Sequence, residues 1–161
     1  MKPDELYDRY GETMFHYLAL RLGSSEDAED VIQETFCRLA RYSVRWALVR
    51  NPKAFVFKVL RNEANRHLAR RIKQRDGDRA NIDDARERMS VIEGPDEASR
   101  ALLARSLDEL PDEQREVVVL KVFQDFSFKE IASLCGLSVN TAASRYRYGI
   151  GKLRSLLEGK L

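Results

Sequence analysis

The chain has 161 residues, of which 43% are hydrophobic and 34% charged, and its formal net charge is +2. This length allows one domain or two small ones, and the composition is typical of a charged, mostly helical protein. No apolar run approaches the roughly 18–20 residues that a membrane span needs, and the N-terminus lacks the apolar core of a signal peptide. We therefore expect a cytoplasmic protein without membrane insertion.

The charges are distributed in blocks along the chain. Residues 41–75 hold eleven Lys/Arg and one acid, a balance of +10, whereas residues 1–40 and 76–98 each carry −5. A segment this basic attracts polyanions, most often phosphate backbones. It also carries aromatic side chains that could stack on unpaired bases, namely Tyr42, Trp46, Phe55 and Phe57. The plainer interpretation, a solvated helix face, explains the acidic blocks well and the basic block poorly.

Amphipathic helices are predicted through the first 75 residues. The first runs from Asp4 to Leu20 and is broken at Gly23, after which Ser25 is the expected N-cap of the second helix. Apolar residues from Ala28 to Leu39 recur on one stripe of the second helix at steps of three and four. The other face of this helix shows Asp30, Gln33, Glu34 and Arg38.

A long basic helix is predicted next, with Asn51 as its cap, Pro52 in its first turn and its end near Arg71. One exposed row combines bases with two asparagines, which solvation alone explains poorly because asparagine is a mediocre helix former. The row consists of Lys58, Arg61, Asn62, Asn65 and Arg66. Trp46, before this helix, is either a lid on the core or a stacking platform, and the lid is favoured because tryptophan is mostly buried.

Residues 76–96 change in character and contain few large apolar side chains between Asp76-Gly77-Asp78 and Gly94-Pro95-Asp96. We interpret them as a flexible acidic linker between two compact helical units. The predicted fold class is therefore all-α, with two small helical domains at residues 1–75 and 97–161. A short helix within the linker, around residues 83–89, is an open alternative.

Helices are also predicted throughout the second domain, and residues 127–150 form a candidate helix-turn-helix. Ala132 is small where the two helices would cross, and Gly136 falls at the turn, where a left-handed backbone is needed. Ser127 and Ser138 are expected to cap the two helices. The second of these helices offers groups suited to base edges and phosphates: Ser138, Asn140, Thr141, Ser144, Arg145 and Arg147. An ordinary helical hairpin with a basic face is the alternative.

Motifs for catalysis and metal binding are missing from the sequence. Cys37 and Cys135 each lie in an apolar helical pattern, so buried free thiols are expected rather than a disulfide or a metal site. His16 and His67 lack neighbours with ligand spacing. There is no glycine-rich phosphate loop and no nucleophile or zinc-protease motif. We expect neither a cofactor nor an enzymatic activity.

Three blocks of the sequence resemble the extracytoplasmic-function sigma factors of bacterial RNA polymerase. Residues 28–39 resemble region 2.2, residues 51–62 resemble regions 2.3 and 2.4, and residues 110–117 with the helix-turn-helix resemble region 4. The three blocks occur in order and at the right separations, and they extend over nearly the whole chain apart from the linker. The chain departs from the family's usual residues at Ala142, Ala143 and Tyr148. Gly149 and Gly151 also interrupt the predicted last helix.

The resemblance implies a role for each surface. Asp30, Gln33, Glu34 and Arg38 would bind core RNA polymerase at the coiled coil of its clamp. Trp46 and the row on the basic helix (Lys58, Arg61, Asn62, Asn65 and Arg66) would open and hold the promoter-melting element. The second helix of the helix-turn-helix would enter the major groove of the distal promoter element. The implied partners are core polymerase, promoter DNA and an anti-sigma protein that covers both units.

Two other classes of function remain open at this point. A stand-alone helix-turn-helix transcriptional regulator would use only the C-terminal unit, and would leave the basic block and the Gln33–Glu34 face without a role. A nucleic-acid enzyme or an RNA-binding protein would use the basic block alone. The sequence lacks the metal ligands and nucleophile motifs that such an enzyme would need. The favoured function is promoter-specific transcription initiation as a polymerase subunit, with no covalent chemistry of its own.

Overall fold

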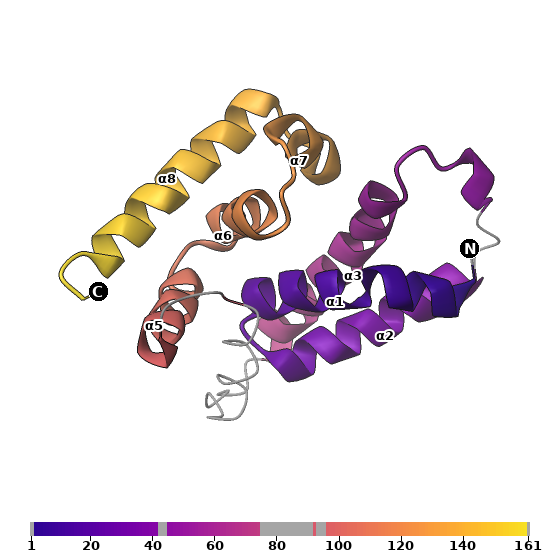
Figure 1. Ribbon diagram of the computed structural model, residues 1–161, viewed down its shortest axis with the longest axis horizontal. Helices are drawn as coiled ribbons and strands as arrows, with labels where there is room; N and C mark the ends of the chain where they lie inside the picture. The colour runs from indigo at the N-terminus through magenta and orange to yellow at the C-terminus, as the bar shows by residue number, and fades with distance from the viewer. Residues whose placement is uncertain (1, 42–44, 75–91, 93–95, 161) are drawn as a thin grey trace.

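The computed structural model describes residues 2–41, 45–74, 92 and 96–160, and within these ranges it contains helices and no strand. Two groups of helices lie side by side, α1 to α3 from the first half of the chain and α5 to α8 from the second (Figure 1). The all-α prediction is confirmed. The predicted linker lies outside the described residues, except for Ile92 and Asp96.

The N-terminal unit consists of α1 (Pro3–Leu22), α2 (Ser25–Arg41) and α3 (Pro52–Gln74), with a short 3-10 helix, η1 (Trp46–Leu48), before α3. Gly23 ends α1 in the left-handed conformation, with φ of 72°. Ser24, rather than the predicted Ser25, caps α2, because its Oγ accepts the Asp27 amide at 3.2 Å while Ser25 is already helical. Asn51 caps α3 as predicted, since its Oδ1 accepts the Ala54 amide at 3.1 Å.

The C-terminal unit consists of α5 (Glu97–Asp108), α6 (Asp112–Val118), α7 (Phe128–Cys135) and α8 (Val139–Leu157). A π-helical segment, η2 (Val119–Phe123), continues α6 and was not predicted. Ser127 and Ser138 cap α7 and α8 through their hydroxyl groups, and Gly136 lies between these helices at φ of 69°. The predicted caps and turn of the helix-turn-helix are confirmed.

Helix α8 passes through both of its glycines without a break. Gly149 is buried against α6, where an added Cβ would lie 2.7 Å from Cγ2 of Val118. Gly151 faces open space. The first glycine therefore allows α8 to lie close to α6, so its helical cost of about 1 kcal/mol is offset by packing.

The two cysteines are free, but the expectation that both are buried was wrong. Cys37 is exposed and Cys135 is half-buried. The buried face of α2 runs through Ala28, Val31 and Thr35, and residue 37 turns away from that stripe. The apolar residues near Cys37 therefore led to the wrong prediction that its side chain lies on the buried face of α2.

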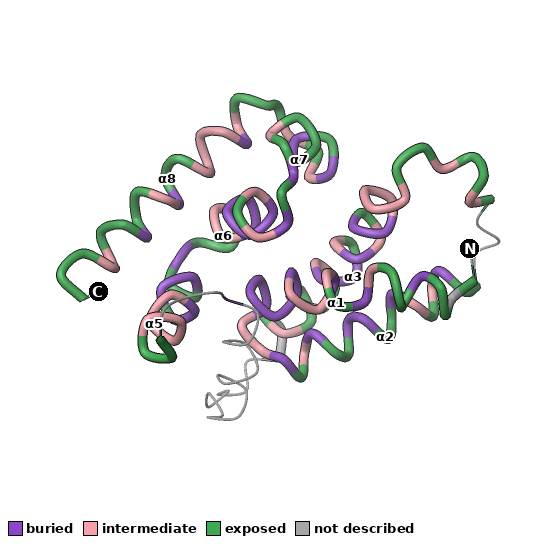
Figure 2. Tube along the Cα trace, in the orientation of Figure 1, coloured by how far each residue is buried: buried purple, intermediate pink, exposed green. Residues whose placement is uncertain are grey.

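Burial differs strongly between helices of the C-terminal unit. The end of α6, residues 116–118, is buried while its start is exposed, whereas α8 is exposed at intervals along its whole length (Figure 2). The core is built mainly from aliphatic side chains of both units, among them Leu18 of α1, Leu60 of α3 and Val117 of α6. None of the described helices is long and apolar enough to cross a membrane.

Candidate nucleic-acid and partner surfaces

The predicted polymerase-binding face of α2 is exposed at three of its four positions, Asp30, Gln33 and Glu34. The fourth, Arg38, is half-buried, and its Nε forms an ion pair with Glu63 of α3. Glu63 is the one acid of the basic block and only 2% exposed. It also accepts a hydrogen bond from Nη1 of Arg66 at 2.9 Å. Arg38 therefore connects α2 to α3, and the exposed part of the predicted polymerase-binding face is limited to Asp30, Gln33 and Glu34.

The predicted promoter-melting row on α3 divides into two adjacent rows. Lys58, Asn62 and Arg66 are spaced four residues apart and are exposed. Arg61 and Asn65, also four apart, are half-buried and lie against other side chains. The difference in exposure follows from helical periodicity, since residues four apart lie on one side of a helix. The row of Arg61 and Asn65 therefore points in a different direction from the row of Lys58, Asn62 and Arg66.

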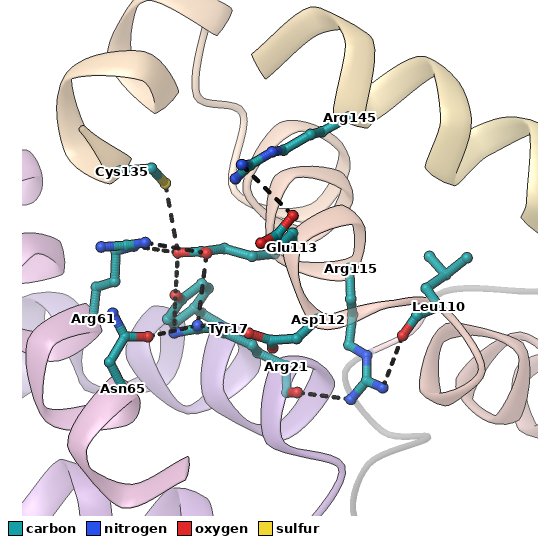
Figure 3. Close-up of polar contacts among 11 residues, drawn as sticks. Tyr17, Arg21, Arg61, Asn65, Leu110, Asp112, Glu113, Arg115, Cys135 and Arg145 are labelled. Atoms are coloured by element: carbon teal, nitrogen blue, oxygen red, sulfur yellow. Dashed lines mark hydrogen bonds and ion pairs between the residues drawn. The ribbon is translucent and has the colours of Figure 1, made fainter. Parts of the chain in front are cut away.

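Arg61 and Asn65 contact groups from both units of the molecule (Figure 3). The Arg61 guanidinium binds the Glu116 carboxylate of α6 through Nε and through Nη2, the latter at 3.4 Å from Oε2. Asn65 Oδ1 accepts a hydrogen bond of 2.7 Å from Nη2 of Arg21, near the end of α1. The same nitrogen lies 3.3 Å from Asp112 Oδ2 of α6. The second row of α3 thus faces the C-terminal unit rather than solvent.

Glu116 lies at the centre of this contact and is only 4% exposed. Besides Arg61, it has Nη2 of Arg21 at 3.6 Å from its carboxylate. It also accepts hydrogen bonds from the Tyr17 hydroxyl and the Cys135 thiol, each at 3.5 Å. A buried carboxylate is tolerated where cations and donors surround it. We call Glu116, Arg61, Arg21, Tyr17 and Cys135 the Glu116 cluster.

Electrostatics keep Arg21, Arg61 and Tyr17 of the cluster in fixed protonation states. Burial lowers the pKa of Arg21, but the neighbouring Tyr17, Glu116 and Asp112 raise it overall above its ordinary value. Burial likewise opposes the charge of Arg61, and its hydrogen bond to Glu116 outweighs that effect and raises the pKa. Burial raises the pKa of Tyr17. The arginines therefore stay charged and the phenol stays a neutral donor at physiological pH.

Cys135 responds to the same surroundings. Burial, followed by the charge of Glu116, raises the pKa of its thiol to about 12. A thiol with so high a pKa is almost entirely protonated near neutral pH, and the thiolate is the reactive form. Cys135 is thus a donor to Glu116 and a poor nucleophile in this arrangement.

Contacts outside the cluster extend the interface between the units. Nη1 of Arg115 donates to the backbone carbonyl of Arg21 at 2.9 Å, which satisfies one of the carbonyls left unpaired at the end of α1. Lys53 Nζ donates to the Gln124 carbonyl at 2.9 Å and lies 4.7 Å from the ring centroid of Phe126. The rings of Phe57 and Phe126 meet edge to face with centroids 5.2 Å apart. The interface therefore combines charged, polar and aromatic contacts.

The segment before α3 places Trp46 against the N-terminal unit. Its ring meets Phe55 edge to face at a centroid distance of 5.6 Å, and the residue is half-buried. Two residues further on, Leu48 is 74% exposed. The contact with Phe55 agrees with the lid interpretation of Trp46, and its partial exposure leaves one side of the residue open.

The predicted distal-element face lies on α8 and is mostly open. Asn140 and Arg147 are exposed, and Ser144 is half-buried. Ser138 and Thr141 are joined at the helix start, where the Ser138 hydroxyl donates to Thr141 Oγ1 at 2.8 Å. Arg145 differs from the others because its Nη2 lies 3.6 Å from Glu113 Oε2 of α6. Because the Glu113 side chain is largely exposed, this ion pair stabilises the position of Arg145 only weakly.

Four of the residues that join the two units were not predicted from the sequence: Tyr17, Arg21, Lys53 and Glu116. A signal was present for Arg21, which follows Met14, Tyr17 and Leu18 at helical spacing and therefore belongs to the apolar stripe of α1. An arginine on such a stripe needs a buried partner. That partner, Glu116, is 95 positions further along the chain, so the local sequence around Arg21 could not identify it.

No group of three or more potential metal-ligating side chains occurs among the residues that the structure describes.

Comparisons with known proteins identify the two units. The family profile of Sigma-70 region 2 matches residues 6–74, and that of Sigma-70 region 4 matches residues 100–153. The ECF RNA polymerase sigma factor SigL of Mycobacterium tuberculosis is 32% identical, over 95% of this chain and 87% of SigL. CarQ, an RNA polymerase sigma factor of Myxococcus xanthus, is 29% identical over 96% of this chain and 88% of its own length.

A solved structure is similar in fold. It is the sigma factor RpoE of Bartonella quintana in complex with the anti-sigma factor NepR, with a TM-score of 0.63 and 24% identity, covering 96% of this chain and 99% of RpoE. Together with the sequence matches, the two helical units define a sigma-70-type protein. The chain belongs to the extracytoplasmic-function family of RNA polymerase sigma factors. The region 2 match accounts for the basic block, which a stand-alone regulator would leave unexplained.

Proposed function

We propose that this sigma factor divides its work among three surfaces. The exposed part of α2, with Asp30, Gln33 and Glu34, binds core RNA polymerase, and Arg38 supports that face through Glu63. Trp46 and the two rows of α3 hold the melted promoter element. The N-terminal half of α8 reads the distal element in the major groove. The units follow the predicted limits of residues 1–75 and 97–161.

The observation that carries this assignment is the separation of the exposed acids from the exposed bases in the N-terminal unit. Asp30 and Glu34 lie on α2, whereas Lys58 and Arg66 lie on α3, and all four are exposed. An acidic and amide-bearing helix face suits a protein partner, while a cationic helix with asparagines suits phosphates and unpaired bases. One small bundle can thus contact polymerase and DNA at the same time.

The assignment of α2 is tested by replacing Gln33 and Glu34 together with alanine. We expect binding to purified core polymerase to weaken at least tenfold, because truncating central interface residues commonly costs about 2 kcal/mol or more. Run-off transcription from a promoter template should fall in parallel. Glu26→Ala is the matched control, since Glu26 is an exposed acid in the first turn of the same helix. Unchanged core binding by the double variant would contradict the assignment.

The assignment of α3 is tested through salt dependence. Lys58→Ala should weaken promoter binding of the reconstituted holoenzyme and lower the slope of log K against log salt by about one, as expected for one lost phosphate contact. Asn62→Ala should weaken binding without changing that slope. Slopes that are identical in both variants and the parent chain would argue against a phosphate contact at Lys58.

The chain is expected to act in the cytoplasm, where bacterial polymerase works, and to leave phosphodiester chemistry to the core enzyme. The complex formed by the RpoE relative supports an anti-sigma partner here too. Such a partner should co-purify with the tagged chain from its host and inhibit transcription when added back. Recovery of core polymerase alone, with no inhibitor, would contradict this part of the proposal.

A further inference from the structure

The buried carboxylate of Glu63 is shared by two arginines that lie on different surfaces of the N-terminal unit. Its Oε1 is paired with Nε of Arg38 on α2 and lies 2.9 Å from Nη1 of Arg66 on α3. The Glu63 side chain is 2% exposed, whereas 31% of the Arg38 side chain and 53% of the Arg66 side chain are exposed. One oxygen atom therefore connects a residue beside the polymerase-binding face to a residue of the DNA-facing row.

We propose that Arg38 is a positioning residue for DNA binding: it keeps the Glu63 carboxylate paired, so that Arg66 can turn from Glu63 to a promoter phosphate. This inference rests on the proposed function of α3. A guanidinium binds the oxygens of a carboxylate and of a phosphate through the same donor geometry. The two acceptors therefore compete for Arg66, and the release of Arg66 depends on what else is paired with Glu63.

The burial of Glu63 decides that competition. A buried carboxylate is tolerated while it has a cation, and removal of the last cation is strongly destabilising. Arg38 and Arg66 are the ion-pair partners of Glu63 in the described part of the chain. With Arg38 in place, Arg66 can leave without isolating a buried charge. Without Arg38, the full cost of isolating Glu63 opposes the transfer of Arg66 to DNA.

The positions of the two arginines indicate which one leaves. Arg66 lies in the exposed row of α3 with Lys58 and Asn62, so a strand that meets this row can reach it. Its pair with Glu63 joins residues three apart on one helix, and such pairs are individually weak. Arg38 joins two helices and is less exposed, so it is the cation that stays. Helix α2 thereby contributes to the DNA surface of α3 without touching DNA.

The test measures how the reconstituted holoenzyme binds a labelled promoter fragment, selected from genomic DNA with the parent holoenzyme, over a range of salt concentrations. Each holoenzyme is purified after assembly, so differences in affinity for core polymerase do not enter. Arg66→Gln and Arg38→Gln should each weaken binding about three- to tenfold and lower the slope of log K against log salt by about one. Arg9→Gln is the matched control, because it removes the same charge from an exposed position of α1 and should keep the slope.

A double variant separates positioning from loss of charge or of folding. In Arg38→Gln/Glu63→Gln no carboxylate at position 63 retains Arg66, and the net charge equals that of the parent chain. Slope and affinity should therefore return to within about twofold of the parent values, as expected for coupled residues. A purely structural role of Arg38 predicts instead that the double variant binds no better than Arg38→Gln, because the contact between α2 and α3 is still missing. Helical circular dichroism equal to that of the parent chain confirms folding in each variant.

The outcomes separate this inference from the proposed function. If Arg66→Gln lowers the slope but Arg38→Gln does not, or if the added Glu63→Gln fails to restore it, the positioning role is wrong and the function of α3 stands. The same conclusion follows if Lys58→Ala lowers the slope and Arg66→Gln does not. If neither Lys58→Ala nor Arg66→Gln changes the slope, the assignment of α3 to phosphates is wrong and the inference falls with it.

Discussion

The helices α3 and α8 carry the two predicted DNA surfaces, and the structure treats them differently. On α8, Asn140 and Arg147 are exposed, and Arg145 has a weak ion pair across to Glu113 of α6. On α3, Arg61 and Asn65 are engaged by residues from α1 and α6. Two helices with similar exposed polar chemistry in the sequence thus differ in availability, because only one of them faces the other unit. Availability for DNA is therefore a property of the pair of units rather than of either helix.

Thiol reactivity offers the largest effect with which to sharpen this comparison. Because burial and Glu116 raise the pKa of Cys135 to about 12, its thiolate is scarce at pH 8, whereas Cys37 is exposed. We expect Cys135 to react with iodoacetamide about 100-fold more slowly than Cys37. Mass spectrometry of peptides sampled over time measures both rates in one reaction. Cys37 serves as the internal control.

The same reaction reports opening of the contact at α3. Asp112→Asn removes a charge that pairs with Arg21 at the contact between the units. It should therefore accelerate alkylation of Cys135, which lies at that contact, and leave the rate at Cys37 unchanged. Equal rates at both cysteines in the parent chain would show that the Glu116 cluster does not form in solution.

The two glycines of α8 test how closely that helix is held against α6, which carries Glu116. Gly149→Ala should destabilise the chain by about 1–3 kcal/mol, because its methyl group would meet Val118 at 2.7 Å. Gly151→Ala should stabilise it by about 0.5–1 kcal/mol, since the site is open and alanine favours the helix. Denaturant unfolding measures both, and effects of the same sign would contradict the close approach of α8 to α6.

Helix caps test whether the difference between α3 and α8 has a local origin. Asn51→Ala and Ser138→Ala each remove a side-chain acceptor for an amide of the first turn. Each should cost about 1 kcal/mol in the free energy of unfolding. Similar losses would show that the two helices start alike and differ only through tertiary contacts. A loss several times larger at one cap would place the difference in the helix starts themselves.

The capping box of α7 gives the smallest expected effect. The Ser127 amide donates to Glu130 at 3.0 Å and holds the pKa of that carboxyl below its ordinary value of 4.5. Because the pKa of Glu130 is lower in the folded chain, its ionised carboxylate adds to the free energy of unfolding. This stabilisation is complete above the pKa of the unfolded chain and is lost as the pH falls through the pKa of the folded chain. Glu130→Gln should therefore destabilise the chain slightly at pH 7 and have less effect near pH 3. An effect that grows on acidification would contradict the sign.

Much of the architecture was predictable because its signals are local. Amphipathic spacing predicted the helices, while Asn51, Ser127, Ser138 and Gly136 marked starts and a turn. The one-residue error at Ser24 arose because two adjacent serines are equally good caps in sequence. The π-helical turn after Val118 has no comparable local signal.

The surfaces were predictable only in part. Spacing placed Lys58, Arg61 and Arg66 together on an exposed face, but it could not show which row another unit would cover. Pairing of Arg61 with Glu116 depends on contacts between residues 55 positions apart. The same limit applies to Arg38, whose partner Glu63 lies on a different helix. Long-range ion pairs are fixed by how helices pack, and charge pattern along one helix does not encode them.

The most direct test of a covered α3 is the distance between the units in solution. Spin labels at Glu12→Cys on α1 and Ser155→Cys on α8, both exposed positions, can be introduced after Cys37 and Cys135 are replaced by serine. Pulsed dipolar spectroscopy should give one narrow distance for the free chain and a longer one for the chain bound to core polymerase and promoter DNA. A broad distribution in the free chain, or the same distance in both states, would contradict the account.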